Sequence, residues 1–340
     1  MSRIGILVSE YSTTYGVKVI VEHLRQVMQD LHVVHNINET DKYDIVIPYG
    51  IIQAKAIVKY GRKEKTCALM VDALSLGMIS DFRRMSLYGF IPFKFKIKLL
   101  ARYFAYLYRE YVCLKNYEHV MLVSAYDKSY FARHPLFKRY ADKIVVIPNG
   151  IDINDIMPSK RLTPSDGVVR IGCLSAWNDS AFYTLRIFLE DIWSKAQKKD
   201  DNMRLVVAGT KLTPQKEAIL KQYDNVEVMG FVESLDDFFD NIDISLITFL
   251  KKCGILNKVL DSFAYEVPVL GRPQNFGAFE NIPDCYYTYN DKDSFFSAIK
   301  QITSNPTEVQ TKVKMAKDYI RENHSWEKNY KTLGRVINKL

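Results

Sequence analysis

Short strand-like segments alternate with helix-like segments along the whole chain, and this alternation limits the fold more than any other feature. Runs rich in β-branched residues are typical of buried strands, whereas apolar residues at helical spacing fill the segments between them. The strand-like runs are 3–8, 43–47, 66–71, 120–123 and 144–147, then 168–173, 205–208, 226–229, 244–248 and 267–270. Helices are expected at 17–31, 51–60, 180–199, 214–223, 256–265 and throughout 292–340. This order predicts parallel sheets with crossover helices.

The segment 144–153, IVVIPNGIDI, lies near the middle of the 340 residues. Its β-branched run stops at Pro148, which cannot donate to a sheet, and Asn149-Gly150 is a pair that tolerates positive φ. A chain of this length exceeds one ordinary core. We therefore expect an N-terminal domain at 1–155, a C-terminal domain at 168–322 after a polar linker, and a last helix at 323–340.

Composition narrows the class of protein. Apolar residues make up 48% and charged residues 25%, as in globular proteins, and the N-terminus resembles a first strand and not a signal peptide. The five cysteines are scattered, which favours reduced thiols in a cytoplasmic protein and argues against a zinc site. The 47 Lys and Arg against 39 Asp and Glu favour a phosphate-bearing partner. No nucleic-acid-binding motif accompanies this charge.

The clearest cluster of polar residues lies in 254–271. Gly254 opens a predicted helix, and the free amides and positive dipole end of a helix N-terminus suit a diphosphate. Lys258 follows one turn later and adds a full positive charge. Asp261 comes three residues after Lys258 and is placed to accept hydrogen bonds from ribose hydroxyls.

This cluster and the PNG junction resemble the GT-B glycosyltransferases of family 4 (glycosyl transferases group 1), of the bacterial surface-polysaccharide type. The resemblance spans nearly the whole chain and is best at 120–275. It implies two facing Rossmann-like, doubly wound parallel-sheet domains, with the acceptor in the first and the nucleotide-sugar donor in the second. The donor-binding residues it implies are Gly16, Gly209, Lys211, Phe231, Val232, Gly254, Ile255, Leu256, Asn257 and Asp261.

The chain departs from the family pattern at two places. Asp261 stands where the second residue of the family's Glu-x7-Glu belongs, and Cys253 replaces the first. The loop 173–180 also lacks the Arg and Lys that many members place against the diphosphate. Charge neutralisation is therefore expected from Lys258, assisted by Lys211 or by the pair 251–252, although these assisting lysines also fit a solvated surface.

Asp72 ends the apolar run 66–71, at the strand edge where ligands bind in open α/β folds. By the resemblance it lies beside the acceptor hydroxyl, and with Lys258 it is a candidate catalytic residue. An N-cap for the next helix is the alternative role.

Between residues 83 and 115 lie eight Lys or Arg and nine Tyr or Phe. On a helix, Lys94, Lys98, Arg102 and Arg109 fall within about 80° of one another, beside a broad aromatic face. This composition fits a helix on an anionic membrane and equally a core helix with a basic edge in solvent. The candidate membrane or acceptor residues are Arg83, Arg84, Lys94, Lys98, Arg102 and Arg109.

The resulting hypothesis is a retaining glycosyltransferase that moves a sugar from a nucleotide-diphosphate sugar to a glycan acceptor in surface polysaccharide biosynthesis. A lipid-linked acceptor and peripheral contact with the inner face of the cell membrane are part of this expectation. No cofactor is expected, and no metal, because no Asp-x-Asp or His/Cys cluster stands out. Two alternatives stay open: a sugar-nucleotide 2-epimerase of the same fold, and a non-catalytic nucleotide-sugar-binding subunit of a polysaccharide assembly complex.

Overall fold

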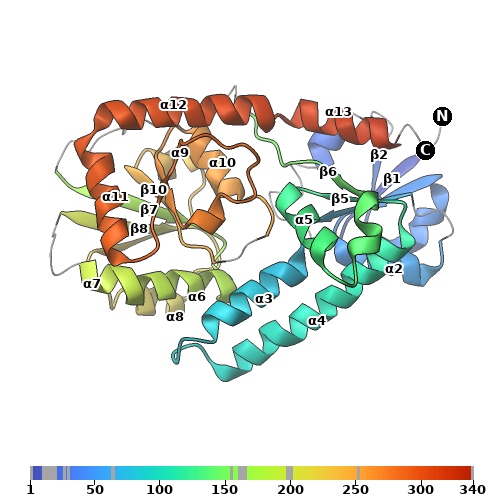
Figure 1. The fold of residues 1–340 in the computed structure, drawn as a ribbon, viewed down its shortest axis with the longest axis horizontal. Coiled ribbons are helices and arrows are strands. Elements are labelled where there is room, and N and C mark those ends of the chain that lie inside the picture. The colour runs from blue at the N-terminus through green and yellow to red at the C-terminus, as the bar shows by residue number, and fades with distance from the viewer. Residues whose placement is uncertain are drawn as a thin grey trace.

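The computed structural model describes residues 3–9, 21–25, 28, 31–62, 66–153, 156–159, 167–196, 202–250 and 253–337. It contains two parallel sheets, one built from the first half of the chain and one from the second (Figure 1). The predicted α/β architecture of two doubly wound parallel-sheet domains is confirmed.

The first sheet consists of two three-stranded parts with the orders β2-β1-β3 and β4-β5-β6. A parallel bridge between Tyr49 and Leu69 connects the two parts. The strands are β1 (Ile4–Leu7), β2 (Leu31–Val34), β3 (Ile45–Pro48), β4 (Cys67–Val71), β5 (His119–Leu122) and β6 (Ile144–Val146). The helical elements are η1 (Ile37–Lys42), α2 (Ile51–Tyr60), α3 (Leu74–Met85), α4 (Phe93–Asn116), α5 (Ala125–Arg133) and η2 (Lys138–Lys143).

The second sheet has six parallel strands in the order β12-β11-β10-β7-β8-β9. Its strands are β7 (Val169–Leu174), β8 (Met203–Ala208), β9 (Val226–Gly230), β10 (Ile244–Ile247), β11 (Val269–Gly271) and β12 (Tyr287–Thr288). The helices are α6 (Asp179–Phe188), continued by the π-helical turn η3 (Leu189–Trp193) and α7 (Ser194–Ala196), then α8 (Pro214–Leu220), α9 (Leu235–Phe239), α10 (Asn257–Ala264), η4 (Pro273–Asn275), α11 (Lys292–Ser304), α12 (Pro306–Asn323) and α13 (Trp326–Ile337).

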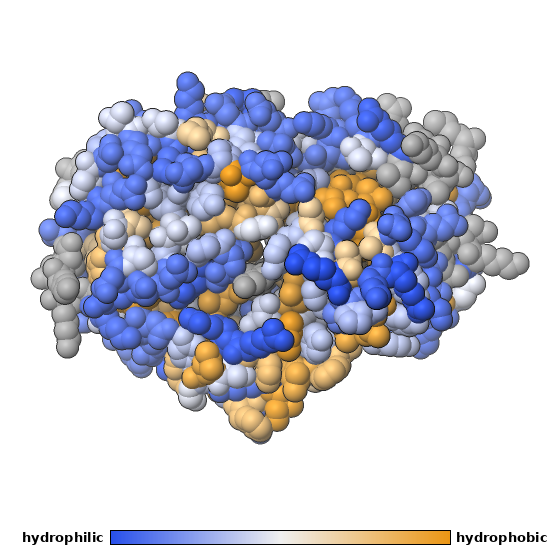
Figure 2. Space-filling view, in the orientation of Figure 1, coloured by the Kyte–Doolittle hydropathy of each residue, from blue (hydrophilic) through white to orange (hydrophobic). Residues whose placement is uncertain are grey.

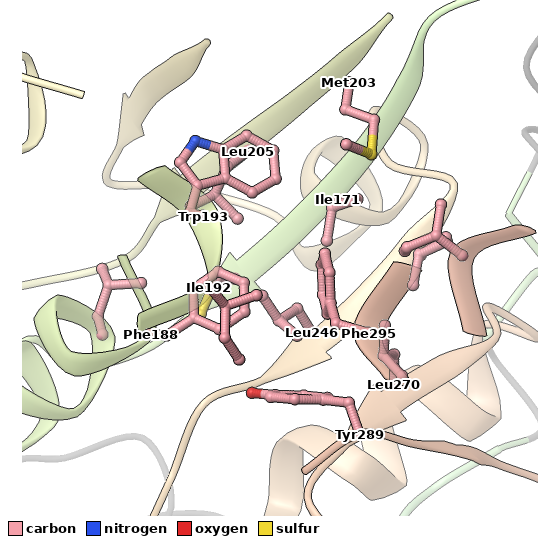
Figure 3. Close-up of a cluster of buried hydrophobic side chains, with 14 of the residues drawn as sticks. Ile171, Phe188, Ile192, Trp193, Met203, Leu205, Leu246, Leu270, Tyr289 and Phe295 are labelled. Atoms are coloured by element: carbon pink, nitrogen blue, oxygen red, sulfur yellow. The ribbon is translucent and has the colours of Figure 1, made fainter. Parts of the chain in front are cut away.

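The core of the second domain lies between its sheet and the helices on one face (Figure 3). Phe188 and Phe295 from two helices pack there against Leu246 of the central strand β10. All four residues of β10 are buried, because helices cover both faces of the sheet. Its sequence therefore lacks the alternation of a half-exposed strand.

Two strands differ from the sequence-based expectation. β2 occupies Leu31–Val34 and begins at the last residue of the segment 17–31, which was expected to be helical. β12 contains only two residues and pairs with β11. Neither segment has a run of β-branched residues long enough to predict a strand.

The helix α13 crosses back onto the first domain, so that α12 and α13 run along one long side of the molecule (Figure 1). The amide of Ile151 donates to the carbonyl of His324 at 2.8 Å, and Trp326 is buried. A Cβ at Gly150 would lie 2.5 Å from the Trp326 ring. Neither Asn149 nor Gly150 has positive φ. The glycine of the PNG segment is therefore needed for close approach, and the positive φ that this pair tolerates is not used.

Helix α3 joins the two domains on the opposite side (Figure 1). Asp81 of α3 accepts a hydrogen bond from the Ser180 hydroxyl of α6 at 2.5 Å. The ring of Phe95 from α4 lies 4.8 Å from that of Tyr183. Of the helices in the described chain, none has the length and apolarity required to span a bilayer.

Candidate functional site

The ammonium of Lys258 lies at the carboxyl edge of the second sheet. Its Nζ donates to the carbonyl of Leu174 at 2.8 Å and to the Ser175 hydroxyl at 3.2 Å. It also lies 3.9 Å from the centroid of the Phe249 ring. These contacts hold the charge where open α/β sheets bind their ligands.

Gly209 follows β8 and lies against the same loop. It has φ of +126°, and a Cβ there would come within 1.9 Å of the Ser175 carbonyl oxygen. A side chain at this position would therefore displace the loop that anchors Lys258. Lys211, two residues later, has φ of +63° and is exposed.

The segment after β9 lies beside Gly209, whose amide donates to the Gly230 carbonyl at 2.6 Å. Gly230 has φ of +75° with no atom within 4 Å of a built Cβ. Its glycine is thus required by backbone conformation. Phe231 is 69% exposed and Val232 is half-buried.

Asp261 lies one turn into α10. Burial raises the pKa of its carboxyl to about 7, and the nearby Lys258 ammonium opposes this shift. At the start of the same helix, Asn257 Oδ1 accepts a hydrogen bond from Asn149 Nδ2 at 2.8 Å. The PNG segment therefore contacts the first residue of the candidate donor helix.

The amide of Gly254, expected to bind a diphosphate, already has a partner. It donates to both carboxylate oxygens of Asp127, at 3.0 and 3.2 Å, and Asp127 of α5 is fully buried. No hydrogen bond from the backbone amides of Ile255, Leu256 or Asn257 is found among the described residues. These three amides, and not that of Gly254, are the donors available to an anion at this helix start.

Asp72 lies directly against Gly254, although the two residues belong to different domains. A Cβ at Gly254 would fall 2.2 Å from Asp72 Oδ1. Val71 before it has φ of +76°, at an irregularity in the pairing of β4 with β5. A β-branched residue rarely adopts this conformation, which turns Asp72 out of the strand.

Two buried carboxyl groups cap the start of α3, immediately after Asp72. Asp127 Oδ2 accepts from the Ala73 amide at 3.1 Å, and Glu110 Oε1 accepts from the Ser75 amide at 2.8 Å. Ala73 is the N-cap residue, so capping of α3 by the side chain of Asp72 is not observed. Burial raises the pKa of Glu110 to about 8, against the opposing effect of its Ser75 hydrogen bonds.

Neither Asp127 nor Glu110 was identified from the sequence. Ser124 accepts a hydrogen bond from the Asp127 amide at 3.1 Å, so Ser124-x-x-Asp127 indicates a helix start and nothing more. Between the domains Asp127 binds the amides of Ala73 and Gly254, which are separated from it by 54 and 127 positions along the chain. A local sequence pattern cannot reveal partners at such separations.

A cavity of about 300 Å³ remains beside Gly254, between the two domains. Its lining includes Tyr126 of α5, Leu256 at the start of α10, and the loop after β11 at Asn275 and Ala278. The start of α10 is therefore covered on the Asp127 side and open to this cavity on another.

The basic residues of the α3–α4 segment lie apart from the donor candidates. Lys94, Lys98 and Arg102 are exposed along α4, whereas Arg109 is half-buried with its guanidinium 5.3 Å from the Tyr106 ring. At the end of α3, Arg83 is exposed, and Arg84 lines a second cavity. The candidate residues Gly16, Lys251 and Lys252 lie outside the described residues.

Residues 168–305 match the family model "Glycosyl transferases group 1". A curated protein from Xenopus tropicalis, "Glycosyltransferase 1 domain-containing protein 1", is 25% identical over 158 residues. That match covers 44% of this chain and 46% of the relative, so the chain aligns with less than half of the relative's length.

Solved structures similar to this fold include sucrose-phosphate synthase from Thermosynechococcus elongatus, with a TM-score of 0.74, 14% identity and coverage of 100% of this chain and 99% of that one. HepE from Anabaena, solved in complex with UDP, has a TM-score of 0.69 at 11% identity and covers 99% and 100% of the two chains. A HepE complex with UDP-glucose gives a TM-score of 0.68 at 12% identity, with full coverage of both chains. The fold is therefore of the GT-B type, and the domain match supports a transferase.

Proposed function

Because residues 168–305 match the glycosyl transferases group 1 model within a GT-B fold, we propose that this protein is a retaining glycosyltransferase of the family-4 type. It transfers a sugar from a nucleotide-diphosphate sugar to an acceptor hydroxyl. The observation that carries this proposal is the contact of Asp72 with Gly254, which joins the candidate acceptor side to the candidate donor loop.

In the proposed reaction the bond between the anomeric carbon and the diphosphate oxygen breaks, and a bond to the acceptor oxygen forms on the same face. The acceptor proton passes to the departing phosphate. The Lys258 ammonium and the amides of 255–257 stabilise the charge that develops on the diphosphate. Asp72 orients the acceptor hydroxyl, and Asp261 accepts hydrogen bonds from the ribose.

The donor site is tested by Lys258→Ala and Asp261→Ala, with Lys221→Ala as a control. Lys221 is exposed at the end of α8. A hydrogen bond to a charged group contributes about 1.5–3 kcal/mol, so each donor-site variant is expected to weaken UDP binding roughly 10- to 100-fold in calorimetry. UDP-glucose is a suitable first donor, since HepE was solved with it. Unchanged affinity and turnover in both variants would remove the proposed site.

We further propose that the acceptor is a lipid-linked glycan of a surface polysaccharide and that the α3–α4 hairpin contacts the membrane. The hairpin surface consists of the exposed apolar residues Leu87, Phe93, Ile97, Phe104 and Tyr108. In Figure 2 an apolar region covers the tip of the molecule at this hairpin. Lys94, Lys98 and Arg102 lie exposed beside it on α4, which suits anionic headgroups.

Membrane contact is tested with Phe93→Ser/Ile97→Ser in co-sedimentation with phosphatidylglycerol vesicles. The control is Ile52→Ser, which alters an equally apolar residue, 55% exposed, on α2. Loss of binding in the hairpin variant only is the expected result. Equal binding by all three proteins would exclude the hairpin surface as the contact.

Incubation of the protein with UDP-sugars separates this proposal from its rivals. A free epimer formed without acceptor would indicate an epimerase. Tight binding with neither hydrolysis nor transfer would indicate a non-catalytic subunit.

A further inference from the structure

A second cavity, of about 330 Å³, lies where the end of α3 meets the second domain. Four basic side chains line it: Arg84 of α3, Lys195 of α7, Arg272 after β11 and Lys292 at the start of α11. Both domains contribute to it, because Arg84 belongs to the first and the other three to the second. The two acidic residues in its lining are Asp191 and Asp291.

Both carboxylates are engaged by other groups. Asp191 accepts a hydrogen bond from the Tyr88 hydroxyl. Asp291 caps α11, where its Oδ1 accepts from the Ser294 amide at 2.9 Å and the Ser294 hydroxyl at 2.7 Å. These contacts occupy one oxygen of each carboxylate, and the charge of Asp291 still acts on Arg272. Lys292 Nζ lies 3.7 Å from Asp293 Oδ1, outside the cavity lining. The four cations of the lining nevertheless outnumber its two carboxylates.

The two arginines are the side chains of this cavity that best suit an anion. Arg272 is only 7% exposed, with Nη1 donating to the Asn290 carbonyl at 2.8 Å and its guanidinium 5.0 Å from the Tyr289 ring. Arg84 Nε is buried and has no hydrogen-bond partner among the described residues. A buried guanidinium N–H without an acceptor is costly, and the planar fork of donors that an arginine presents to a cavity fits a phosphate.

We propose that this cavity, lined by Arg84, Arg272 and Lys292, binds a phosphate or diphosphate carried by the acceptor. The inference rests on the proposed function and defines its acceptor class. Arg84 lies in the last turn of α3, and Asp72 directly precedes Ala73, the N-cap of that helix. At 1.5 Å per residue the two are about 15–18 Å apart.

That separation sets the geometry of the acceptor. A phosphate held by Arg84 leaves about 15 Å of glycan between itself and a hydroxyl at Asp72. Leu87, three residues after Arg84, is 73% exposed and belongs to the hairpin surface. An acceptor whose glycan carries a phosphate next to a lipid would place the phosphate at Arg84 and the lipid at the hairpin surface.

The test measures inorganic pyrophosphate binding by calorimetry in the presence of saturating UDP, so that the donor site is occupied. The variants are Arg84→Gln and Lys292→Gln, with Lys300→Gln as the matched control. Lys300 is exposed on α11 and outside the cavity. Each cavity variant is expected to bind pyrophosphate at least 10-fold more weakly, with no change in Lys300→Gln. Because Arg272 is buried, it is changed to lysine, which keeps the positive charge. Arg272→Lys is expected to retain part of the pyrophosphate binding.

Absence of pyrophosphate binding to the UDP-loaded protein, or equal binding by the cavity variants and Lys300→Gln, would overturn the inference. A wild-type protein that binds no UDP would instead refute the proposed function. Phosphatidylglycerol vesicles distinguish the source of the phosphate. Unchanged vesicle binding by Arg84→Gln, together with lost pyrophosphate binding, supports an acceptor phosphate. Parallel loss of vesicle binding would assign the cavity to a bilayer headgroup and overturn the acceptor assignment.

Discussion

Replacement of Asp127 by alanine should loosen the contact between the two domains at Gly254. The Asp127 carboxylate accepts from the Gly254 amide at 3.0 and 3.2 Å and from the Ala73 amide at 3.1 Å. A buried amide left without a partner costs about 1–3 kcal/mol. Loss of both acceptors therefore costs about 2–6 kcal/mol, unless water enters to replace them. Asp127→Asn keeps one side-chain oxygen as an acceptor, so it should lose roughly half of this free energy.

Amide hydrogen exchange at Gly254 is the direct assay, because it reports opening of this contact without any ligand. Ser124→Ala is the matched control. It removes the N-cap of the same helix, at a cost of about 0.5–2 kcal/mol, but leaves the carboxylate in place. We expect exchange at Gly254 to accelerate at least 10-fold more in Asp127→Ala than in Ser124→Ala. Equal rates in the two variants would refute a bridging role for Asp127.

Two further outcomes follow from the same region. The Glu110 carboxyl stays protonated in the folded protein up to a pKa of about 8, whereas the unfolded chain releases that proton near its ordinary value of 4.5, so stability falls as pH rises through this window. Denaturation of Glu110→Gln at pH 5 and pH 8 should show a smaller decrease than wild type, and an identical decrease would contradict the assignment. Gly254→Ala should abolish transfer, because its Cβ would fall 2.2 Å from Asp72 Oδ1, while Gly230→Ala, at similar φ but in open space, should cost only about 1–2 kcal/mol in melting experiments. Similar effects of the two glycine substitutions would show that the contact with Asp72 is unimportant.

Most strands could be predicted from the sequence because their signal is local. The run at 144–147 ends at Pro148, and the structure places β6 at Ile144–Val146. β12 could not be found in this way, because two residues become a strand only through their pairing with β11. The same limit applies to β2, whose four residues include His32.

The candidate site was predictable in its residue types and only partly in its contacts. The helix expected after Gly254 is present as α10, and Lys258 lies at the sheet edge. The partner of the Gly254 amide could not be predicted, because the Asp127 carboxylate reaches it from the other domain. The basic cavity of Arg84 and Arg272 likewise exists only where the domains meet.

Cys253 stands where the family's Glu-x7-Glu pattern has its first glutamate, and it lies in contact with the first domain. A Cβ on Gly77 of α3 would lie 2.7 Å from Cys253 Sγ, and Cys253 packs within the apolar core of the first domain. Cys253 also lines the cavity beside Gly254, but a longer side chain here would first have to displace α3 at Gly77. Cys253 therefore holds α3 of the first domain close to the start of the Gly254 loop, and Cys253→Glu should destabilise the protein because the larger side chain would separate the two.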